Sequence, residues 1–228
     1  MPAIQLSDAP AVLSPYDVLA SGLSSLPTHA MLFIGEVQRN DVTLASSVPV
    51  SHMRPPIRDE SRTVQFCGSA ALTAPETRMV KDFVDTQRRT VLASKRRQQI
   101  DQYAIHQESE DISPDDTLPR FSCATYVTGA YEQAAIELID RLIPMKTLAD
   151  LKQIYTDPQQ LAALDDPAQR ILLGIGAGSQ WPILMVGYLL HSLARTPAQI
   201  RSAPYRPSVG DEYFPSNAST ANPGLSSP

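Results

Sequence analysis

The sequence predicts an α+β domain in which short strands come first along the chain and helices follow. Compact apolar runs bounded by turn residues occupy the segment between residues 16 and 67. Helical segments with recognisable starts follow from residue 73 onward. The chain has 228 residues, of which 43% are hydrophobic and 19% are charged, so it is long enough to bury one sizeable core.

The strand candidates make up a small antiparallel sheet. Residues 16–20 have the composition of a short strand, and a loop rich in Ser, Gly and Pro leads from there to Thr28. Residues 29–35 form an apolar run that ends at a glycine, which is typical of a buried strand. Residues 42–45 are expected to be the return strand of a hairpin. The segments 48–50 and 63–67 are expected to be further short strands.

The first helix is expected over residues 73–101. Thr73 is a suitable cap, Pro75 lies in the first turn, and Glu76 follows the cap by three residues. Its far half is basic and is interpreted as a solvated face, because no aromatic residues are interleaved that would stack on bases. Its inner side is expected to carry Met79, Val80, Phe83, Val84, Val91, Leu92 and Ile100.

Further helices are expected at 123–142, 148–155 and 159–164. Residues 171–194 carry no formal charge, but glycines dilute this segment and Pro182 divides it. Two buried helices, or one kinked helix, are therefore favoured over a membrane span. The chain from Pro204 onward is rich in Pro, Ser and Asn and is expected to be loosely ordered.

Composition excludes several classes of function. The net charge of −5 argues against a general nucleic-acid-binding protein. Two cysteines cannot build a disulfide framework, and the four histidines show no metal-ligand spacing, so no metal or other cofactor is expected. The first residues lack the features of a signal peptide. We therefore expect a protein made in the cytoplasm that stays there or leaves without a cleaved signal.

Cys123 lies where a polar loop meets an apolar helix. The first turn of a helix presents unpaired N–H groups and partial positive charge, which favour a thiolate, although a small buried residue at a helix start is equally ordinary. A cysteine nucleophile needs a base, and His29 is favoured because it opens a buried strand directly after a loop. His52 and His106 are interpreted as solvated side chains, and His191 as a core residue.

Four short blocks share their order with one family. They are residues 13–19 (LSPYDVL), 28–35 (THAMLFIG), 121–127 (FSCATYV) and 196–202 (TPAQIRS). In this pattern the chain resembles the circularly permuted branch of the NlpC/P60 papain-like cysteine hydrolases, which includes YiiX-like and lecithin:retinol acyltransferase-like proteins. The blocks resemble the family's opening strand, its histidine strand, its nucleophile helix and its closing segment, respectively. Tyr16 replaces the usual glycine of the opening strand.

The resemblance implies a permuted papain-like fold, with a small antiparallel sheet packed against helices. Residues 1–205 would be the catalytic domain, residues 144–195 a helical insertion within it, and residues 206–228 a loosely ordered tail. It also implies acyl transfer, in which Cys123 is the nucleophile and His29 the base. The backbone N–H of Cys123 would hold the oxyanion together with a second donor.

The second oxyanion donor and the residue that orients His29 are less well defined. Tyr103 is a candidate for the oxyanion donor. The family often has a polar residue on the return strand to orient the histidine, but the matching position here falls on Leu44. Candidates that could substitute for it are Asp17, Glu36, Asp41 and Thr43.

Three functions follow as alternatives from the resemblance. The first is an amidase or endopeptidase acting on bacterial cell-wall peptides. The missing signal peptide would fit a toxin exported by a specialised system, such as a type VI effector paired with an immunity protein, or a phage-borne enzyme. The second is a lipid acyl hydrolase or acyltransferase that uses residues 171–194 at a membrane. The third is an interaction module in which Cys123 and His29 no longer catalyse.

Overall fold

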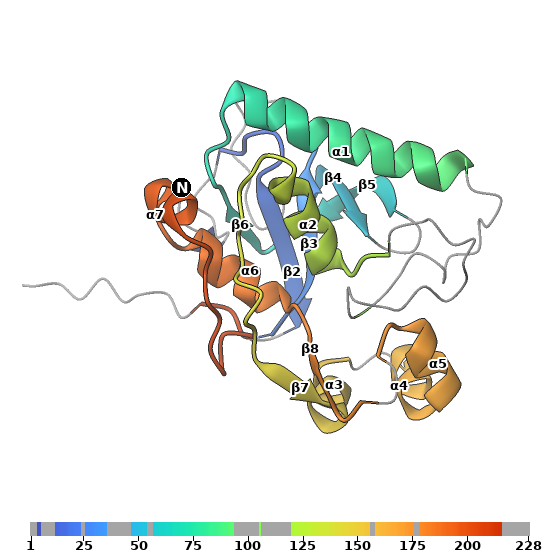
Figure 1. Ribbon diagram of the computed structural model, residues 1–228. Helices are drawn as coiled ribbons and strands as arrows, with labels where there is room; N and C mark the ends of the chain where they lie inside the picture. Colours follow the sequence, from blue (N-terminus) through green and yellow to red (C-terminus); the bar gives the residue numbers. More distant parts are fainter. Residues whose placement is uncertain are drawn as a thin grey trace, which may run out of the picture.

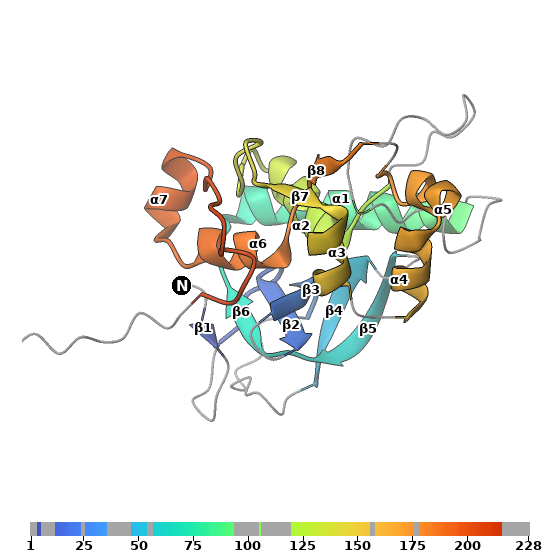
Figure 2. The same cartoon turned by 90° about the horizontal axis from the view of Figure 1, so that it is seen from below.

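A single sheet with helices on one face forms the main body of the protein (Figures 1 and 2). The computed structural model describes residues 4–5, 12–23, 26–35, 47–53, 57–93, 105, 120–155, 158–175 and 178–215. The strands of the sheet are β1 (Ile4–Gln5), β2 (Val18–Leu23), β3 (Leu26–Phe33), β4 (Ser47–Met53), β5 (Ile57–Thr63) and β6 (Phe66–Gly68). The helices are α1 (Ala74–Ala93), α2 (Cys123–Glu132), α3 (Leu148–Ile154), α4 (Pro158–Asp165), α5 (Pro167–Leu172), α6 (Val186–Leu193) and α7 (Pro197–Ser202).

The six strands are ordered β1-β6-β2-β3-β4-β5, and each neighbouring pair is antiparallel. Helices α1, α2 and α6 lie on one side of this sheet (Figure 2). Within that layer α2 contacts β3 and β4, α6 contacts β3, and α1 contacts α2 and β5. The α+β class expected from the sequence is thus confirmed.

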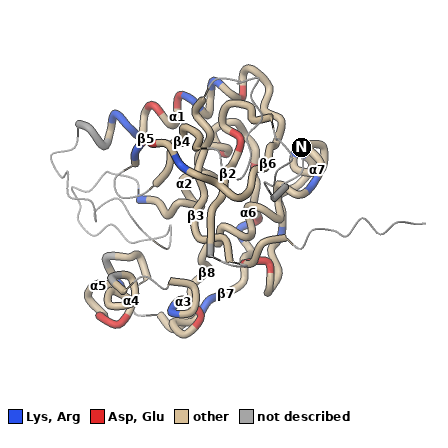
Figure 3. Tube along the Cα trace, turned by 180° about the vertical axis from the view of Figure 1, so that it is seen from behind, with Lys and Arg blue, Asp and Glu red and all other residues tan. Residues whose placement is uncertain are grey.

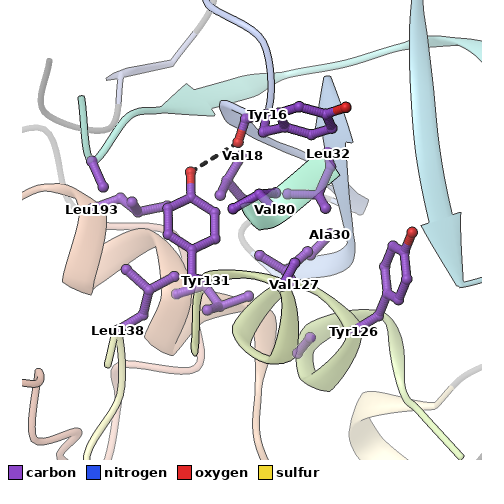
Figure 4. Packing of buried hydrophobic residues seen from close by; sticks show 14 of the residues in the cluster. Tyr16, Val18, Ala30, Leu32, Val80, Tyr126, Val127, Tyr131, Leu138 and Leu193 are labelled. Carbon is purple, nitrogen blue, oxygen red and sulfur yellow. Dashed lines mark hydrogen bonds between the residues drawn. The ribbon is translucent and has the colours of Figure 1, made fainter. Parts of the chain in front are cut away.

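Side chains from alternate positions of the strands fill two cores, one on each face of the sheet. The core on the helical face includes Ala30 and Leu32 of β3 and Tyr126 and Val127 of α2 (Figure 4). The core on the other face includes Met31 and is smaller. The two faces of β3 are therefore both covered, which explains why its sequence is a nearly continuous apolar run.

The helix α1 begins as the sequence predicts. The backbone N–H of Thr73 donates to Glu76 Oε2 at 2.6 Å, and the N–H of Thr77 donates to the Thr73 carbonyl oxygen. Val80 and Val84 are buried as expected, but Met79 is 50% exposed, so its assignment to the inner side is wrong. The helix is described as far as Ala93, and its expected continuation to residue 101 lies outside the described residues.

Charged residues of both signs occur along α1 (Figure 3). Arg88 contacts Asp85 on its own helix and Asp59 on β5. The described part of this face is therefore more than a solvated surface, because Arg88 also connects α1 to the edge strand of the sheet.

The helix α2 is shorter than the sequence predicts. It ends at Glu132 rather than near residue 142. The N–H groups of Ala134 and Ile136 both bond to the Tyr131 carbonyl oxygen, and Ala135 has a φ of 55°. This left-handed residue turns the chain and brings Ile136 into the core, so tertiary burial overrides local helix propensity.

The segment 144–195 combines a small separate unit with a helix of the main core. Strands β7 (Met145–Thr147) and β8 (Gln180–Pro182) pair with each other, and α3, α4 and α5 lie between them in the chain. The expected helices at 148–155 and 159–164 are confirmed. This unit has its own apolar cluster, which contains Leu151, Leu164, Ile175 and Trp181. The description of the whole segment as a helical insertion is therefore incomplete.

The uncharged segment 171–194 is not a pair of helices. Its first part ends α5, turns at Gly174 with a φ of 77°, and then forms β8. Beyond the end of α5, the described residues of this segment form one helix, α6, which is buried in the main core. Within the described residues, no helix is long and apolar enough to cross a membrane.

Part of the chain beyond residue 205 packs against the main body. Phe214 stacks on Phe66 of β6, with ring centroids 4.1 Å apart. Glu212 pairs with the largely buried Lys146 at 3.1 Å. The expectation of a loosely ordered tail is therefore wrong for residues 206–215, and residues 216–228 lie outside the described residues.

Candidate active site

Cys123 is the first residue of α2, as the sequence predicts. Ser122 is the N-cap, and its side chain accepts a hydrogen bond from the N–H of Thr125 at 3.1 Å. The Thr125 hydroxyl in turn accepts from the N–H of Ser122 at 2.7 Å, which completes a capping box. This pair of bonds fixes the start of the helix and thereby the position of Cys123.

The sulfur of Cys123 lies against β3 beside His29. The thiol donates to the carbonyl oxygen of Thr28, with an S···O distance of 3.8 Å. The N–H of Ala30 also faces the sulfur. Thr28 and Ala30 are the two neighbours of His29 in the chain, so the sulfur lies against the backbone of β3 on both sides of His29.

Burial raises the pKa of the Cys123 thiol above its ordinary value. The N–H groups of Ala30, Ala124 and Cys123 lower the pKa, but they only partly offset the burial. The direction of this shift is opposite to the one that a helix start alone would give. A base has to remove its proton before it can act as a nucleophile.

A β-bulge lies at the position of His29. In the pairing of β2 with β3, Ser21 is opposite His29 and Gly22 is opposite Pro27, so Thr28 is an additional residue on β3. Pairing of β3 with β4 covers only Leu32 and Phe33, and the two strands separate toward His29. A bulge turns the strand locally, and its additional residue, Thr28, is the one whose carbonyl oxygen contacts the Cys123 thiol.

The side chain of His29 contacts a second histidine. His29 Nε2 hydrogen-bonds to His52 Nδ1, and the two rings meet edge to face with centroids 4.7 Å apart. His52 is fully buried on β4, and its Nε2 lies 2.9 Å from Oε1 of Glu60 on β5. The interpretation of His52 as a solvated side chain is therefore wrong. The site instead holds the series His29, His52 and Glu60.

Of the other predicted candidates, the described residue Asp17 is not brought to this site. Asp17 is buried in the turn before β2, where its Oδ2 accepts the N–H of Ser14 at 2.8 Å. Its carbonyl oxygen bonds to the N–H of Phe33 on β3, four residues and about 13 Å along the strand from His29. Asp17 is therefore a turn residue. Thr43, Tyr103, Glu36, Asp41 and His106 lie outside the described residues.

His191 is half-buried on α6, where its ring stacks on Tyr205 with centroids 6.1 Å apart. The expectation that it is a core residue is wrong, because 24% of its side chain is exposed, and it takes no part in the site. Among the described residues no group of His, Cys, Asp and Glu has an arrangement that would hold a metal ion.

Sequence reasoning missed both His52 and Glu60, although one signal was present. Val48, Val50 and His52 alternate with other residues, so an extended strand 48–52 would have placed the histidine on the same face as two buried valines. Pro49 and the nearby prolines obscured that pattern.

Comparison of the chain with protein-family models, with curated proteins and with solved structures finds no match.

Proposed function

We propose that this protein is a cysteine-dependent hydrolase that cleaves amide bonds. Cys123 would be the nucleophile, His29 the general base and acid, and His52 the residue that orients His29. The observation that carries the proposal is the contact of the Cys123 sulfur with the two neighbours of His29, whose ring is held by a buried histidine. Nucleophile, base and orienting group are the three parts that acyl transfer requires.

The hydrogen bond between the histidines supports a division of roles between the nitrogens of His29. Nε2 bonds to His52, and in the proposed reaction Nδ1 accepts the proton of the Cys123 thiol. The thiolate then attacks the carbonyl carbon of the substrate, and the protonated His29 delivers its proton to the leaving amine. Water, activated by the now neutral His29, hydrolyses the acyl-enzyme and regenerates the thiol.

The start of α2 supports the same reaction through its backbone. The N–H of Cys123 belongs to the first turn, where N–H groups have no partner within the helix. Such a donor can stabilise the oxyanion that develops as the thiolate attacks. The capping box of Ser122 and Thr125 holds this turn in place before substrate binds.

The resemblance to the permuted NlpC/P60 branch supports the class of substrate. The opening block adds a structural point, because Tyr16, which replaces the family's glycine, has a φ of 68°. Glycine adopts that left-handed conformation at least cost, so the backbone at Tyr16 has the conformation for which the family's glycine is suited.

From the resemblance we propose short peptides of the bacterial cell wall as the substrate, and delivery to a target cell by a specialised secretion system as the biological setting.

Two measurements test the proposal. Purified peptidoglycan incubated with the protein should release peptide fragments detectable by mass spectrometry, and Cys123→Ala should abolish that release. Liposomes should lose no fatty acid in parallel, because α6, the helical part of segment 171–194, is buried. Fatty-acid release with intact peptidoglycan would instead establish the lipid hydrolase, and full biological activity of Cys123→Ala would establish an interaction module.

Alkylation of Cys123 tests its pairing with His29 without any knowledge of the substrate. Iodoacetamide should label Cys123 in the folded protein, and His29→Ala should slow that labelling at least about tenfold near neutral pH. Cys67 is an internal control, because it is 3% exposed and burial raises its pKa to about 12. Equal labelling of the two cysteines, or no effect of His29→Ala, would contradict the proposal.

A further inference from the structure

Glu60 approaches His52 on the side opposite to His29. Its Oε1 lies 2.9 Å from His52 Nε2, whereas His52 Nδ1 faces His29. The contact brings a carboxylate close to the imidazole, so the two groups interact electrostatically. Arg62 Nε lies 2.5 Å from the same oxygen and holds the carboxylate from outside. The histidine is fully buried and the carboxylate half-buried, which keeps the interaction only partly screened by water.

The sheet fixes this arrangement. Strands β4 and β5 pair over seven consecutive positions, with Val50 opposite Glu60 and His52 opposite Arg58. Glu60 and His52 are therefore diagonal neighbours on one face of an antiparallel ribbon, within reach of long side chains. A partner on a paired strand needs no loop movement to stay beside the imidazole, so the contact is preorganised.

We propose that Glu60 is a positioning residue that sets the protonation pattern of both histidines. This proposal rests on the proposed function of the site. A carboxylate beside His52 Nε2 repels a lone pair there and attracts a proton, so it favours the Nε2–H tautomer of His52. His52 Nδ1 is then the acceptor, and His29 must donate to it through Nε2–H. The lone pair of His29 is thereby confined to Nδ1, the nitrogen that takes the Cys123 proton.

The same carboxylate acts after proton transfer. When His29 Nδ1 takes the thiol proton, the ring becomes an imidazolium, and its positive charge interacts electrostatically with His52 and Glu60. A negative group at the end of the series stabilises that positive charge, as the buried acid does in other acyl-transfer triads. Loss of the carboxylate should therefore lower the rate of thiol ionisation, with substrate binding left unchanged.

The test compares Glu60→Gln with Glu60→Asp and with Asp59→Asn. Glutamine keeps the shape of the side chain but is neutral, and its amide can donate to His52 Nε2, which would switch His52 to the Nδ1–H tautomer. Aspartate keeps the charge and should restore part of the rate. Asp59 is the adjacent residue on β5, is paired with Arg88 on α1, and serves as the matched control.

Two readouts are taken from the full-length protein. Nitrogen-15 NMR of the imidazole rings should show an Nε2–H tautomer of His52 in the wild type and in Asp59→Asn, and an Nδ1–H tautomer in Glu60→Gln. Alkylation of Cys123 near neutral pH should slow about 10- to 100-fold in Glu60→Gln, less in Glu60→Asp, and less than about twofold in Asp59→Asn.

The outcomes separate this inference from the proposed function. If His29→Ala leaves the alkylation of wild-type Cys123 unchanged, the proposed function fails, whatever the tautomer of His52. If His29 is required but Glu60→Gln changes neither the tautomer nor the rate, only the role of Glu60 is overturned. An Nδ1–H tautomer of His52 in the wild type would also overturn it. A folded state equal to wild type by circular dichroism is required of each variant.

Discussion

Replacement by phenylalanine should have opposite effects on stability at two buried tyrosines. Tyr131 and Tyr188 both have side chains fully removed from solvent. The hydroxyl of Tyr131 donates to the Tyr16 carbonyl oxygen at 2.8 Å, as Figure 4 shows. The hydroxyl of Tyr188 has no hydrogen-bond partner in the described part of the chain. Changing each to phenylalanine removes the same oxygen atom from two contrasting environments.

The expected magnitudes follow from the fate of the partner atom. Tyr131→Phe leaves the buried carbonyl of Tyr16 without its donor, which costs about 1–3 kcal/mol of the free energy of unfolding. Tyr16 has a φ of 68°, a conformation unfavourable for a side-chain-bearing residue by about 1–2 kcal/mol, so this bond also holds a strained turn. Tyr188→Phe removes a hydroxyl that is buried without a hydrogen bond. The free energy of unfolding should therefore stay unchanged or rise by about 1 kcal/mol.

Urea denaturation followed by circular dichroism measures both variants. For a chain of this length, each kcal/mol also changes the Tm by about 2–4 °C, which provides a second measurement. Equal losses in the two variants would refute the reasoning. A loss below about 0.5 kcal/mol in Tyr131→Phe would refute it as well, because the bond would then contribute less than an ordinary exposed one.

Three further substitutions test separate parts of the structure. Gly187→Ala would place a Cβ 2.3 Å from the Asp211 carbonyl oxygen and displace the 206–215 segment. Limited proteolysis should therefore cleave that segment faster than in the wild type. Gly129→Ala is the control, because its Cβ would lie 3.4 Å from the Phe83 ring and cleavage should stay unchanged. Gly22→Ala would place a Cβ 2.2 Å from the Leu26 carbonyl oxygen, and the distorted bulge should slow Cys123 alkylation. Burial raises the pKa of the Asp17 carboxyl in the folded protein above its value in the unfolded chain. The neutral carboxyl therefore favours the folded state at low pH, and this contribution is lost as the pH rises and the carboxyl ionises. Asp17→Asn should therefore gain stability over wild type in urea denaturation from about pH 4 upward, with Cys123 alkylation unchanged; a constant difference at all pH values would contradict this.

Helix starts could be predicted from the sequence because their determinants are local. Glu76 lies three residues after Thr73, and its carboxylate accepts the backbone N–H of Thr73 at the first turn of α1. The end of α2 could not be predicted in this way. It depends on Ala135 adopting a left-handed conformation so that Ile136 can reach the core, and no nearby glycine or proline announces that turn.

Cys123 and His29 are 94 positions apart in the sequence, yet the sequence predicts them as a pair. Cys123 begins a helix as expected, whereas His29 is the fourth of the eight residues of β3 and does not open the strand, so that expectation is wrong. The direction in which the pKa of the Cys123 thiol is shifted could not be predicted in the same way. Burial of the sulfur outweighs the backbone N–H groups, and burial depends on the whole fold.

The strand β5 shows why the remaining members of the site escaped prediction. Its sequence, IRDESRT, has only Ile57 as an apolar residue, so its composition is that of a loop. It forms a strand because it pairs along β4 at the edge of the sheet, where charged side chains protect an exposed edge from further pairing. The polarity that hides the strand from sequence reasoning also supplies Glu60 to the buried His52. A carboxylate on a central, apolar strand would have to be fully desolvated at much greater cost. Partners of a catalytic histidine should therefore be sought on polar segments that directly follow a predicted buried strand.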